Sequence, residues 1–464
     1  MHEVRSIVAV VERAGLPAAD GARWAASAPS PDPAASFAAA SAAVSSFLVR
    51  GGELARRLPG RPRRTAAERD AAETIAGLMN DARERYLTAH AAALYDELTA
   101  GRTAALRVEE LLTRAAERVP GLVPAPADLA AERARELPAK EGVELAQGTF
   151  VARVLAVPEQ GRHLIGAMLR PTVMARELAG ELRAAGRVDL GPVLLRREGR
   201  AGVLELRNPE HLNAEDGTTL GATECAVDLI LLDPDIEVGV LRGGVVDHPR
   251  YPGVRVFGAG LNLTHLYAGR LDYLFYLLRD LGYVHKIYRG IAEDAGRPDV
   301  TGEKLWIAVV ERFAVGGACQ LLHVVDHVIA ARGSRLFLPA RKEGIIPGAS
   351  NLRLPRFVGD RAARQAIFSG REWTAGEPDA AALCDEVVEQ TAVDRALAAR
   401  IEALTDSGLV NAVANRRALR IGQEPLDVFR EYMAAFAAEQ ARCHLSPALV
   451  RNLQAHWNGR ARAR

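Results

Sequence analysis

The amino-acid sequence changes character near residue 190, and this change limits the possible folds more than any other feature. Residues 1–190 are rich in Ala, Arg, Glu and Leu, all of which favour helices. From Gly191 onward, short apolar runs alternate with helical stretches. Strands that alternate with helices pair in parallel through crossover connections. We therefore expect a helical N-terminal domain over residues 1–190 and an α/β domain over residues 191–390.

Local motifs place helices on both sides of the α/β domain. Thr65-Ala-Ala-Glu68 is a capping box, so a helix should begin there. Prolines between Pro120 and Pro126 interrupt the helical pattern and mark a connector. After Asp360 we expect helix to the end of the chain, with residues 391–464 as a helical C-terminal segment.

Within the α/β domain, the spacing of apolar residues predicts the individual elements. The expected strands are 203–206, 238–241, 306–310, 328–331 and 336–338. The expected helices are 227–232, an amphipathic helix over 271–281, and a helical run from 317 to 328.

Composition indicates a folded chain without an extended basic surface. Apolar residues make up 49% and charged residues 25% of the 464, and the net charge is +1. We therefore expect no affinity for nucleic acid or for a membrane surface. No apolar run reaches the ~18 residues of a membrane helix, and we expect no secretory signal. The four cysteines lie far apart, which is typical of reduced thiols in a cytoplasmic protein.

Several familiar catalytic motifs are missing or incomplete. The sequence has no G-x-S-x-G and no G-x-x-x-x-G-K-[ST], and Gly258-Ala-Gly260 lacks the third glycine of a dinucleotide site. His323 and His327 would share a helix face as metal ligands do, but the Glu of H-E-x-x-H is absent. We interpret both histidines as partly buried polar residues and expect no metal.

Two glycine segments carry more information about chemistry. Each of them, 257–261 and 313–317, follows an expected strand and precedes an expected helix. A turn of small residues at a helix start leaves backbone N–H groups unpaired, and two such turns facing each other would form an oxyanion hole. On its own, each segment is more often a site of close packing.

Four motifs occur in order between residues 200 and 390. They are Asn208-Pro209 with Leu212-Asn213-Ala214, Phe257-x-Ala259-Gly260-Leu261-x-Leu263, Ala314-Val-Gly-Gly317-Ala-Cys319, and Ile346-Pro347-Gly348. This set resembles the crotonase (enoyl-CoA hydratase/isomerase) superfamily. The resemblance implies an α/β fold with a ββα spiral core that binds acyl-CoA thioesters, here with an all-α N-terminal domain and a helical C-terminal tail. It also implies the backbone N–H groups of Leu261 and Gly317 as the oxyanion donors.

Two departures from the superfamily pattern restrict the reaction. Hydratases of this superfamily carry one glutamate three residues after the oxyanion glycine and another seven residues before the proline of Ile-Pro-Gly. These positions hold Gln320 and Ala340 here. An amide is no general base near pH 7 and Ala does no proton chemistry, so hydration of a double bond is unsupported.

Within the superfamily, the helical extension and residues 316–322 and 338–348 are most similar to oxygenases that need no cofactor. This resemblance implies a dioxygenase that converts (3,5-dihydroxyphenyl)acetyl-CoA and O2 to the arylglyoxylate and free CoA in dihydroxyphenylglycine and glycopeptide antibiotic biosynthesis. The ring and the thioester both delocalise the Cα carbanion, and the resulting enolate can give an electron to O2. We therefore expect no metal, flavin or other cofactor.

Further residues have candidate roles with open alternatives. Gln320, Arg279 and Glu215 would hydrogen-bond the substrate or its ring hydroxyls, or else be solvated or packing residues. Ala340 and Ile345 would line an apolar O2 pocket or belong to the plain core.

Loop residues near the glycine turns are the remaining candidates. The expected substrate contacts are His248, Arg250, Tyr251, Ala259, Gly260, Asn262 and Gly316. The first three would approach CoA, with an ordinary exposed loop as the alternative. Residues 341–343 are interpreted as charged loop residues.

Two other functions remain open at this point. One is a different crotonase activity, such as an acyl-CoA isomerase or a thioester hydrolase, without O2 chemistry. The other is a non-catalytic acyl-CoA-binding or scaffold protein. The resemblance also implies a homotrimer or a hexamer, in which residues 391–464 would pack between subunits.

Overall fold

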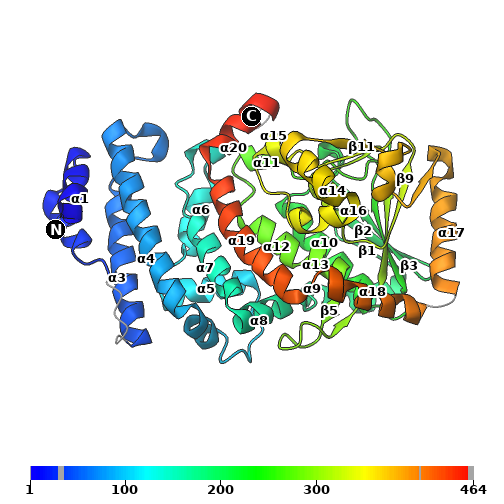
Figure 1. Cartoon of the computed structure of the whole chain (residues 1–464), viewed down its shortest axis with the longest axis horizontal. Helices are drawn as coiled ribbons and strands as arrows, with labels where there is room; N and C mark the ends of the chain where they lie inside the picture. Colours follow the sequence, from blue (N-terminus) through cyan, green and yellow to red (C-terminus); the bar gives the residue numbers. More distant parts are fainter. Residues whose placement is uncertain (1, 30–35, 407–408, 458–464) are drawn as a thin grey trace.

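The computed structural model describes residues 2–29, 36–406 and 409–457. It places a block of helices at one end of the molecule and a large sheet with its covering helices at the other (Figure 1). The N-terminal helices are α1 (His2–Arg13), α2 (Ala18–Ala25), α3 (Phe37–Arg56), α4 (Ala66–Leu98), α5 (Val108–Arg118), α6 (Pro126–Arg133), α7 (Leu145–Ala156), α8 (Pro158–Leu169) and α9 (Val173–Ala185).

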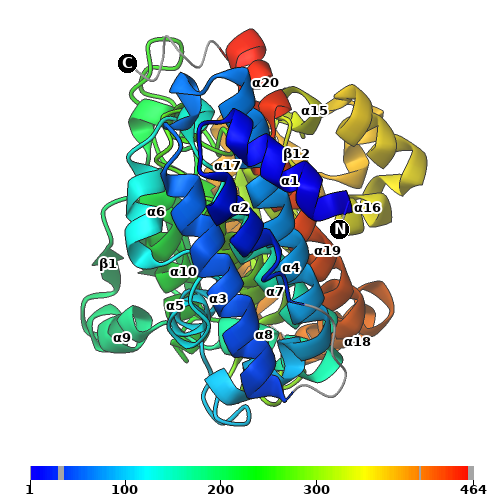
Figure 2. The same cartoon turned by 90° about the vertical axis from the view of Figure 1, so that its left-hand side faces the viewer.

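The long helix α4 begins where the sequence predicts. Thr65 Oγ1 accepts a hydrogen bond from the Glu68 amide, and Glu68 Oε2 accepts one from the Thr65 amide at 2.7 Å, which confirms the capping box. Figure 2 shows α1 and α2 lying across α3 and α4 at the outer end of the block. There Trp24 stacks on Phe47, with ring centroids 4.9 Å apart.

The main sheet has the strand order β1-β2-β3-β4-β7-β9-β12 in the described residues. Its strands are β1 (Arg187–Asp189), β2 (Val193–Glu198), β3 (Ala201–Leu206), β4 (Val238–Gly243), β7 (Leu305–Val310), β9 (His327–Ala331) and β12 (Glu386–Val388). The pairs among β1, β2 and β3 are antiparallel, and every pair from β3 to β12 is parallel, as the alternation of strands and helices predicts.

Two small sheets complete the core. One has the order β11-β10-β8, built from β8 (Phe313–Val315), β10 (Arg335–Phe337) and β11 (Glu372–Thr374). The other pairs β5 (Ile291–Ala292) with β6 (Thr301–Gly302). The remaining core helices are α10 (Gly217–Leu232), α11 (Leu263–Tyr267), α12 (Leu274–Leu281), α13 (Tyr283–Arg289), α14 (Gly317–Leu321), α15 (Ala340–Glu343) and α16 (Ser350–Arg364).

Successive side chains of each central strand point to opposite faces of the main sheet, and both faces are buried. In β7, Trp306 and Ala308 join the cluster formed with α10 and α13, whereas Ile307 and Val309 join the cluster formed with α17. A parallel sheet covered on both faces needs such continuous apolar strands.

The C-terminal helices are distributed over both ends of the molecule. They are α17 (Val393–Asp406), α18 (Leu409–Gln423), α19 (Leu426–His444) and α20 (Pro447–Trp457). Helix α17 covers the main sheet, whereas α19 packs along α7 of the N-terminal block (Figure 1). Residues 407–408 and 458–464 of the expected tail lie outside the described residues.

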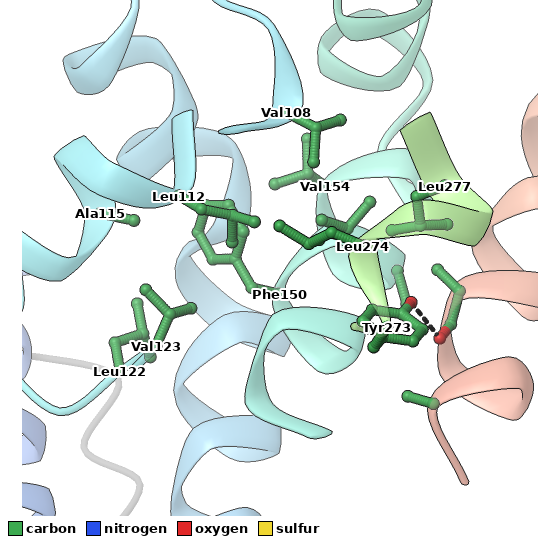
Figure 3. Packing of buried hydrophobic residues seen from close by; sticks show 14 of the residues in the cluster. Val108, Leu112, Ala115, Leu122, Val123, Phe150, Val154, Tyr273, Leu274 and Leu277 are labelled. Carbon is green, nitrogen blue, oxygen red and sulfur yellow. Dashed lines mark hydrogen bonds between the residues drawn. The ribbon is translucent and has the colours of Figure 1, made fainter. Parts of the chain in front are cut away.

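One hydrophobic cluster joins the N-terminal block to the core. Figure 3 shows Phe150 and Val154 of α7 beside Leu274 and Leu277 of α12, and α12 also supplies side chains to the candidate site. At the edge of this cluster, the Tyr273 hydroxyl donates to the Ala437 carbonyl of α19 at 2.6 Å. The position of α12 therefore depends on helices from distant parts of the chain.

Two expectations about elements are wrong. The helix expected over 317–328 ends at Leu321, and β9 begins at His327, so His323 lies in the turn between them and the two histidines share no helix face. The chain after Asp360 is not wholly helical, because β11 and β12 each extend a sheet at its edge. The amphipathic helix expected over 271–281 is present as α12, and it is buried along its whole length because it lies between the N-terminal block and the core.

No helix in the described ranges combines the length and the apolar character that crossing a lipid bilayer requires.

Candidate active site

The two glycine segments lie side by side. The Gly258 amide donates to the Phe313 carbonyl at 3.3 Å, and the Val315 amide donates to the Gly258 carbonyl at 3.0 Å. A Cβ atom on Gly260 would lie only 2.9 Å from the Gly317 nitrogen, so the two turns are in direct contact. Gly260 also has a φ of 78°, a conformation that side chains other than glycine rarely adopt.

The amides of Leu261 and Gly317 remain free for a ligand. In the bridge between Glu215 and Leu261, Glu215 uses both of its backbone groups, on Gly260 and Asn262, so the Leu261 amide points away from Glu215. Gly317 is the first residue of α14, and the first amides of a helix have no partner within it. Within the described residues, neither amide donates to the protein.

A buried polar cluster lies directly behind Gly317. The Arg279 guanidinium of α12 donates from Nε to both oxygens of Glu215 at 3.1 Å, from Nη1 to Gln320 Oε1 at 2.9 Å and from Nη2 to the Gly317 carbonyl at 2.7 Å. The Tyr283 hydroxyl also donates to Glu215. The structure thus brings together Glu215, Arg279, Gln320 and Gly317, which the sequence analysis had named separately.

The Ile346-Pro347-Gly348 motif closes the other side of this cluster. A Cβ atom on Gly348 would lie 2.5 Å from Gln320 Oε1 and 2.6 Å from Asp280 Oδ1. Asp280 in turn accepts a hydrogen bond from the Ala349 amide at 3.1 Å. A glycine at 348 therefore lets the motif pack directly on the residues next to Arg279.

Burial and neighbouring charges together shift the pKa values in this cluster. Burial alone would lower the pKa of Arg279, but the neighbouring Glu215 carboxylate outweighs it and holds the pKa above its usual value. Burial raises the pKa of Tyr283 well above its usual value. Arg279 is therefore a permanent cation, and Tyr283 is a neutral hydrogen-bond donor.

Other expected substrate contacts have different surroundings. The Asn262 amide group donates to Asp216 at 2.9 Å, and its oxygen accepts from the His265 amide, so this side chain fixes the first turn. Tyr251 packs against Phe313 with ring centroids 5.5 Å apart, beside the second turn.

The remaining loop candidates lie either in the loop that holds His248 and Arg250 or in the two glycine turns. His248 accepts a hydrogen bond from the Arg250 amide at 3.2 Å, so their contact stays within the loop. Ala259 lies half-buried between the two turns, and Gly316 directly precedes the second donor with a φ of 53°.

Ala340 and Ile345, which we expected to line an O2 pocket, lie on either side of Glu343 in the sequence. We had expected Glu343 to be a charged loop residue. Ala340 begins α15 and is buried, and Ile345 follows α15 and is half-buried. Glu343, between them, is 8% exposed rather than part of a solvated loop. A Cβ atom on Gly316 would lie 3.5 Å from Glu343 Oε1, which puts this carboxylate beside the second turn.

The sequence of the whole chain can now be compared with known proteins. Residues 197–424 match the family model for enoyl-CoA hydratase/isomerase. The (3,5-dihydroxyphenyl)acetyl-CoA 1,2-dioxygenase of Amycolatopsis orientalis is 48% identical over 400 residues, which are 86% of this chain and 92% of that protein. The chain belongs to the enoyl-CoA hydratase/isomerase family.

Other similar proteins cover a smaller part of this chain. A probable enoyl-CoA hydratase of Rhizobium meliloti (strain 1021) is 28% identical over 42% of this chain and 68% of its own length. A solved enoyl-CoA hydratase from Mycobacterium avium subsp. paratuberculosis K-10 is 17% identical and has a TM-score of 0.48, with 57% of this chain and 98% of that chain covered.

The site holds a small set of polar groups. Gln320 and Ala340 stand at the two positions where the superfamily resemblance led us to expect the glutamates of a hydratase. Among the described residues, no three His, Cys, Asp or Glu side chains are grouped so that they would hold a metal ion. The groups present are two backbone donors, a buried Arg279 cluster and the Glu343 carboxylate.

Proposed function

We propose that the protein is a dioxygenase that converts (3,5-dihydroxyphenyl)acetyl-CoA and O2 to (3,5-dihydroxyphenyl)glyoxylate and free CoA. The observation that carries this proposal is the pairing of the free Leu261 and Gly317 amides with Gln320 and Ala340 at the hydratase positions. Such a site stabilises an enolate but lacks the two acids that would add water. The 48% identity to the Amycolatopsis orientalis enzyme supports this choice of substrate.

The two amides would act on the thioester carbonyl. Loss of a Cα proton places negative charge on the carbonyl oxygen, and each N–H aimed at that oxygen contributes about 3 kcal/mol in the transition state. The enolate gives one electron to O2, and the two radicals combine at Cα to form a peroxide. The peroxide attacks the thioester carbonyl, the CoA thiolate leaves, and the cyclic peroxide opens to the ketoacid. Both added oxygen atoms come from one O2, and no cofactor takes part.

The Arg279 cluster would recognise the ring. A phenolic hydroxyl can donate to Glu215 and accept from Arg279, because a carboxylate is a pure acceptor and a guanidinium is a pure donor. Both side chains are almost fully buried, so an unsubstituted ring would leave their remaining hydrogen-bonding capacity unused. This arrangement favours dihydroxyphenyl over phenyl substrates.

We extend the proposal to a cytoplasmic homo-oligomer, a trimer or a hexamer, in dihydroxyphenylglycine formation for glycopeptide antibiotics. Exposed apolar side chains on α18 support an assembly, since Val410 is 87%, Leu419 61% and Ile421 76% exposed.

An assay without metal tests the proposed reaction. Protein treated with a chelator is mixed with (3,5-dihydroxyphenyl)acetyl-CoA, and O2 uptake and free thiol are followed together. We expect one O2 consumed for each CoA released. CoA release without O2 uptake would instead identify a thioester hydrolase, and binding without turnover would identify an acyl-CoA-binding protein. Either result overturns the proposal.

A further inference from the structure

Enolate formation requires a base, and the residues expected from the hydratase pattern supply none. Gln320 is an amide and Ala340 is apolar. The Glu215 carboxylate is already engaged, because its oxygens accept hydrogen bonds from Arg279 and Tyr283. Asp280 accepts from the Ala349 amide and lies 3.6 Å from the Arg279 guanidinium.

The Glu343 carboxylate differs from these groups in having no donor. Within residues 2–29, 36–406 and 409–457, no hydrogen bond or ion pair reaches its oxygens, although the side chain is only 8% exposed. A buried ionised carboxylate without a partner is costly and is retained rarely without a function. Burial raises the pKa of Glu343 to about 7, which is close to the value that suits a base at neutral pH.

The location of Glu343 fits the atom that must be deprotonated. Its Oε1 lies 3.5 Å from the Cβ position of Gly316, and Gly316 directly precedes the Gly317 donor. The substrate Cα is only two bonds away from the oxygen that this donor would hold. A carboxylate beside Gly316 is therefore adjacent to the residue whose amide would hold the thioester oxygen.

We propose that Glu343 is the catalytic base that removes the Cα proton of the bound arylacetyl-CoA, an inference that rests on the proposed dioxygenase function. The C–H bond breaks, its electron pair enters the enolate, and the proton stays on Glu343. When the peroxide attacks the thioester and the C–S bond breaks, Glu343 gives this proton to the CoA thiolate. Opening of the cyclic peroxide breaks the O–O bond and the second Cα–H bond, and Glu343 takes that proton and releases it to solvent.

Hydrogen exchange without O2 isolates this step from the oxidation. The full-length protein is incubated with (3,5-dihydroxyphenyl)acetyl-CoA in D2O under nitrogen, and deuterium at Cα is followed by mass spectrometry. We expect exchange with the wild-type protein and ~100-fold slower exchange with Glu343→Gln, because general bases contribute ~100-fold or more. Exchange by Glu343→Gln within threefold of the wild-type rate would overturn the assignment.

Matched variants separate loss of the base from loss of the fold. Glu389→Gln removes an exposed acid that pairs with Arg332 and should exchange at the wild-type rate. Substrate affinity of Glu343→Gln, measured by calorimetry, should stay within threefold of wild type. If that variant does not fold, Glu343→Asp is tested in its place. Its carboxylate is closer to the backbone by one methylene, so exchange of the Cα proton should slow ~10-fold while substrate affinity stays unchanged. Unchanged exchange by Glu343→Asp would contradict a positioned base.

Turnover in air distinguishes the two proposals. With Cα-deuterated substrate, Glu343→Asp should show a larger isotope effect on kcat than the wild-type protein, because deprotonation becomes rate-limiting. An unchanged isotope effect would contradict the role of Glu343. Wild-type protein that exchanges the Cα proton but consumes no O2 would overturn the dioxygenase while leaving the base in place.

Discussion

The absence of a side chain at residue 317 determines how closely Glu215 and Arg279 approach the proposed oxyanion donor. A methyl group there would overlap Glu215 Oε2 and lie 3.3 Å from Arg279 Nη2. The ion pair that holds the Gly317 carbonyl can therefore approach the turn only because residue 317 is glycine.

Gly317→Ala should therefore reduce turnover sharply. The variant keeps its backbone N–H, but the added methyl group would displace Glu215 and with it the turn. Loss of the alignment of one oxyanion donor lowers kcat by ~100-fold. The matched control is Gly221→Ala on α10, where a Cβ atom meets nothing within 4 Å. Steady-state O2 uptake measures both variants, and a Gly317→Ala protein with near-normal kcat would contradict the assigned donor.

The charge on Glu343 should make stability depend on pH. Burial raises its pKa from the usual 4.5 to about 7, so the folded protein binds this proton more tightly than the unfolded chain. The free energy of unfolding then falls as the pH rises through this window, by on the order of 3 kcal/mol for this group. Burial, and to a smaller extent the Glu343 carboxylate, raises the pKa of Tyr276 on α12, so these two side chains interact electrostatically.

Glu343→Gln removes this pH-dependent loss. The variant should be more stable than wild type at pH 8, and the difference should vanish near pH 4, where the wild-type carboxyl is protonated. Urea denaturation at both pH values measures the effect. A variant that is less stable than wild type at pH 8 would show that the carboxylate has a stabilising partner.

Single residues were predictable from sequence to different extents. The small-residue turns predicted unpaired backbone N–H groups, and the family resemblance assigned them to Leu261 and Gly317, which stay predicted donors. Glu343 was missed because it follows Arg341 and Lys342, and a run of charges usually indicates a solvated loop. Its burial comes from the folding of α15 against the rest of the chain, which no local pattern reveals.

At the scale of elements, the crossing of α7 and α19 determines where α12 lies. A Cβ atom on Gly148 of α7 would lie 2.6 Å from Ala441 Cβ and 3.1 Å from the Tyr273 hydroxyl. The two helices pack this closely because residue 148 has no side chain. Tyr273 directly precedes α12, so this contact links the crossing to the helix that carries Arg279.

Two helix glycines give opposite predictions for the same substitution. Gly77→Ala on α4 should stabilise the protein by about 1 kcal/mol, because Ala favours helix and the site is open. Gly148→Ala should destabilise it by about 1–3 kcal/mol through overpacking. Thermal unfolding compares the two variants, and stabilisation by Gly148→Ala would contradict the tight crossing.

The strands that sequence patterns predicted are the long apolar ones. Strands β3, β4 and β7 each have six residues and are buried on both faces, so their composition alone identifies them. Strands β11 and β12 have three residues each and exist only as additions to sheet edges. Such pairing depends on distant parts of the chain, which is why continuous helix was expected there.

At the scale of the whole molecule, buried charges join the N-terminal block to the core. The guanidinium of Arg107, which directly precedes α5, binds Glu224 of α10 at 2.7 Å. Lys286 of α13 binds Glu224 and Asp228, each at 2.7 Å. Together with the shared hydrophobic cluster, this network couples the two ends of the molecule during unfolding.

Lys286→Met should therefore weaken the whole molecule rather than one end. It leaves Asp228 without its cation and Glu224 with one cation only, and breaking a buried ion pair costs about 3–5 kcal/mol. Lys342→Met, at an exposed site on α15, is the matched control. Calorimetry should show one unfolding transition, lowered only by Lys286→Met. Two separate transitions in the wild-type protein would contradict the coupling.

Labelled dioxygen tests the central claim most directly, because in the proposed reaction the enolate combines with O2 itself and water supplies no oxygen atom to the product. The protein is stripped of metals and given (3,5-dihydroxyphenyl)acetyl-CoA under ¹⁸O2 in unlabelled water, and the ketoacid is weighed by mass spectrometry. We predict two ¹⁸O atoms in each arylglyoxylate molecule and one CoA released with it. A product that carries one label or none, or turnover that requires an added metal or flavin, would contradict the proposed chemistry.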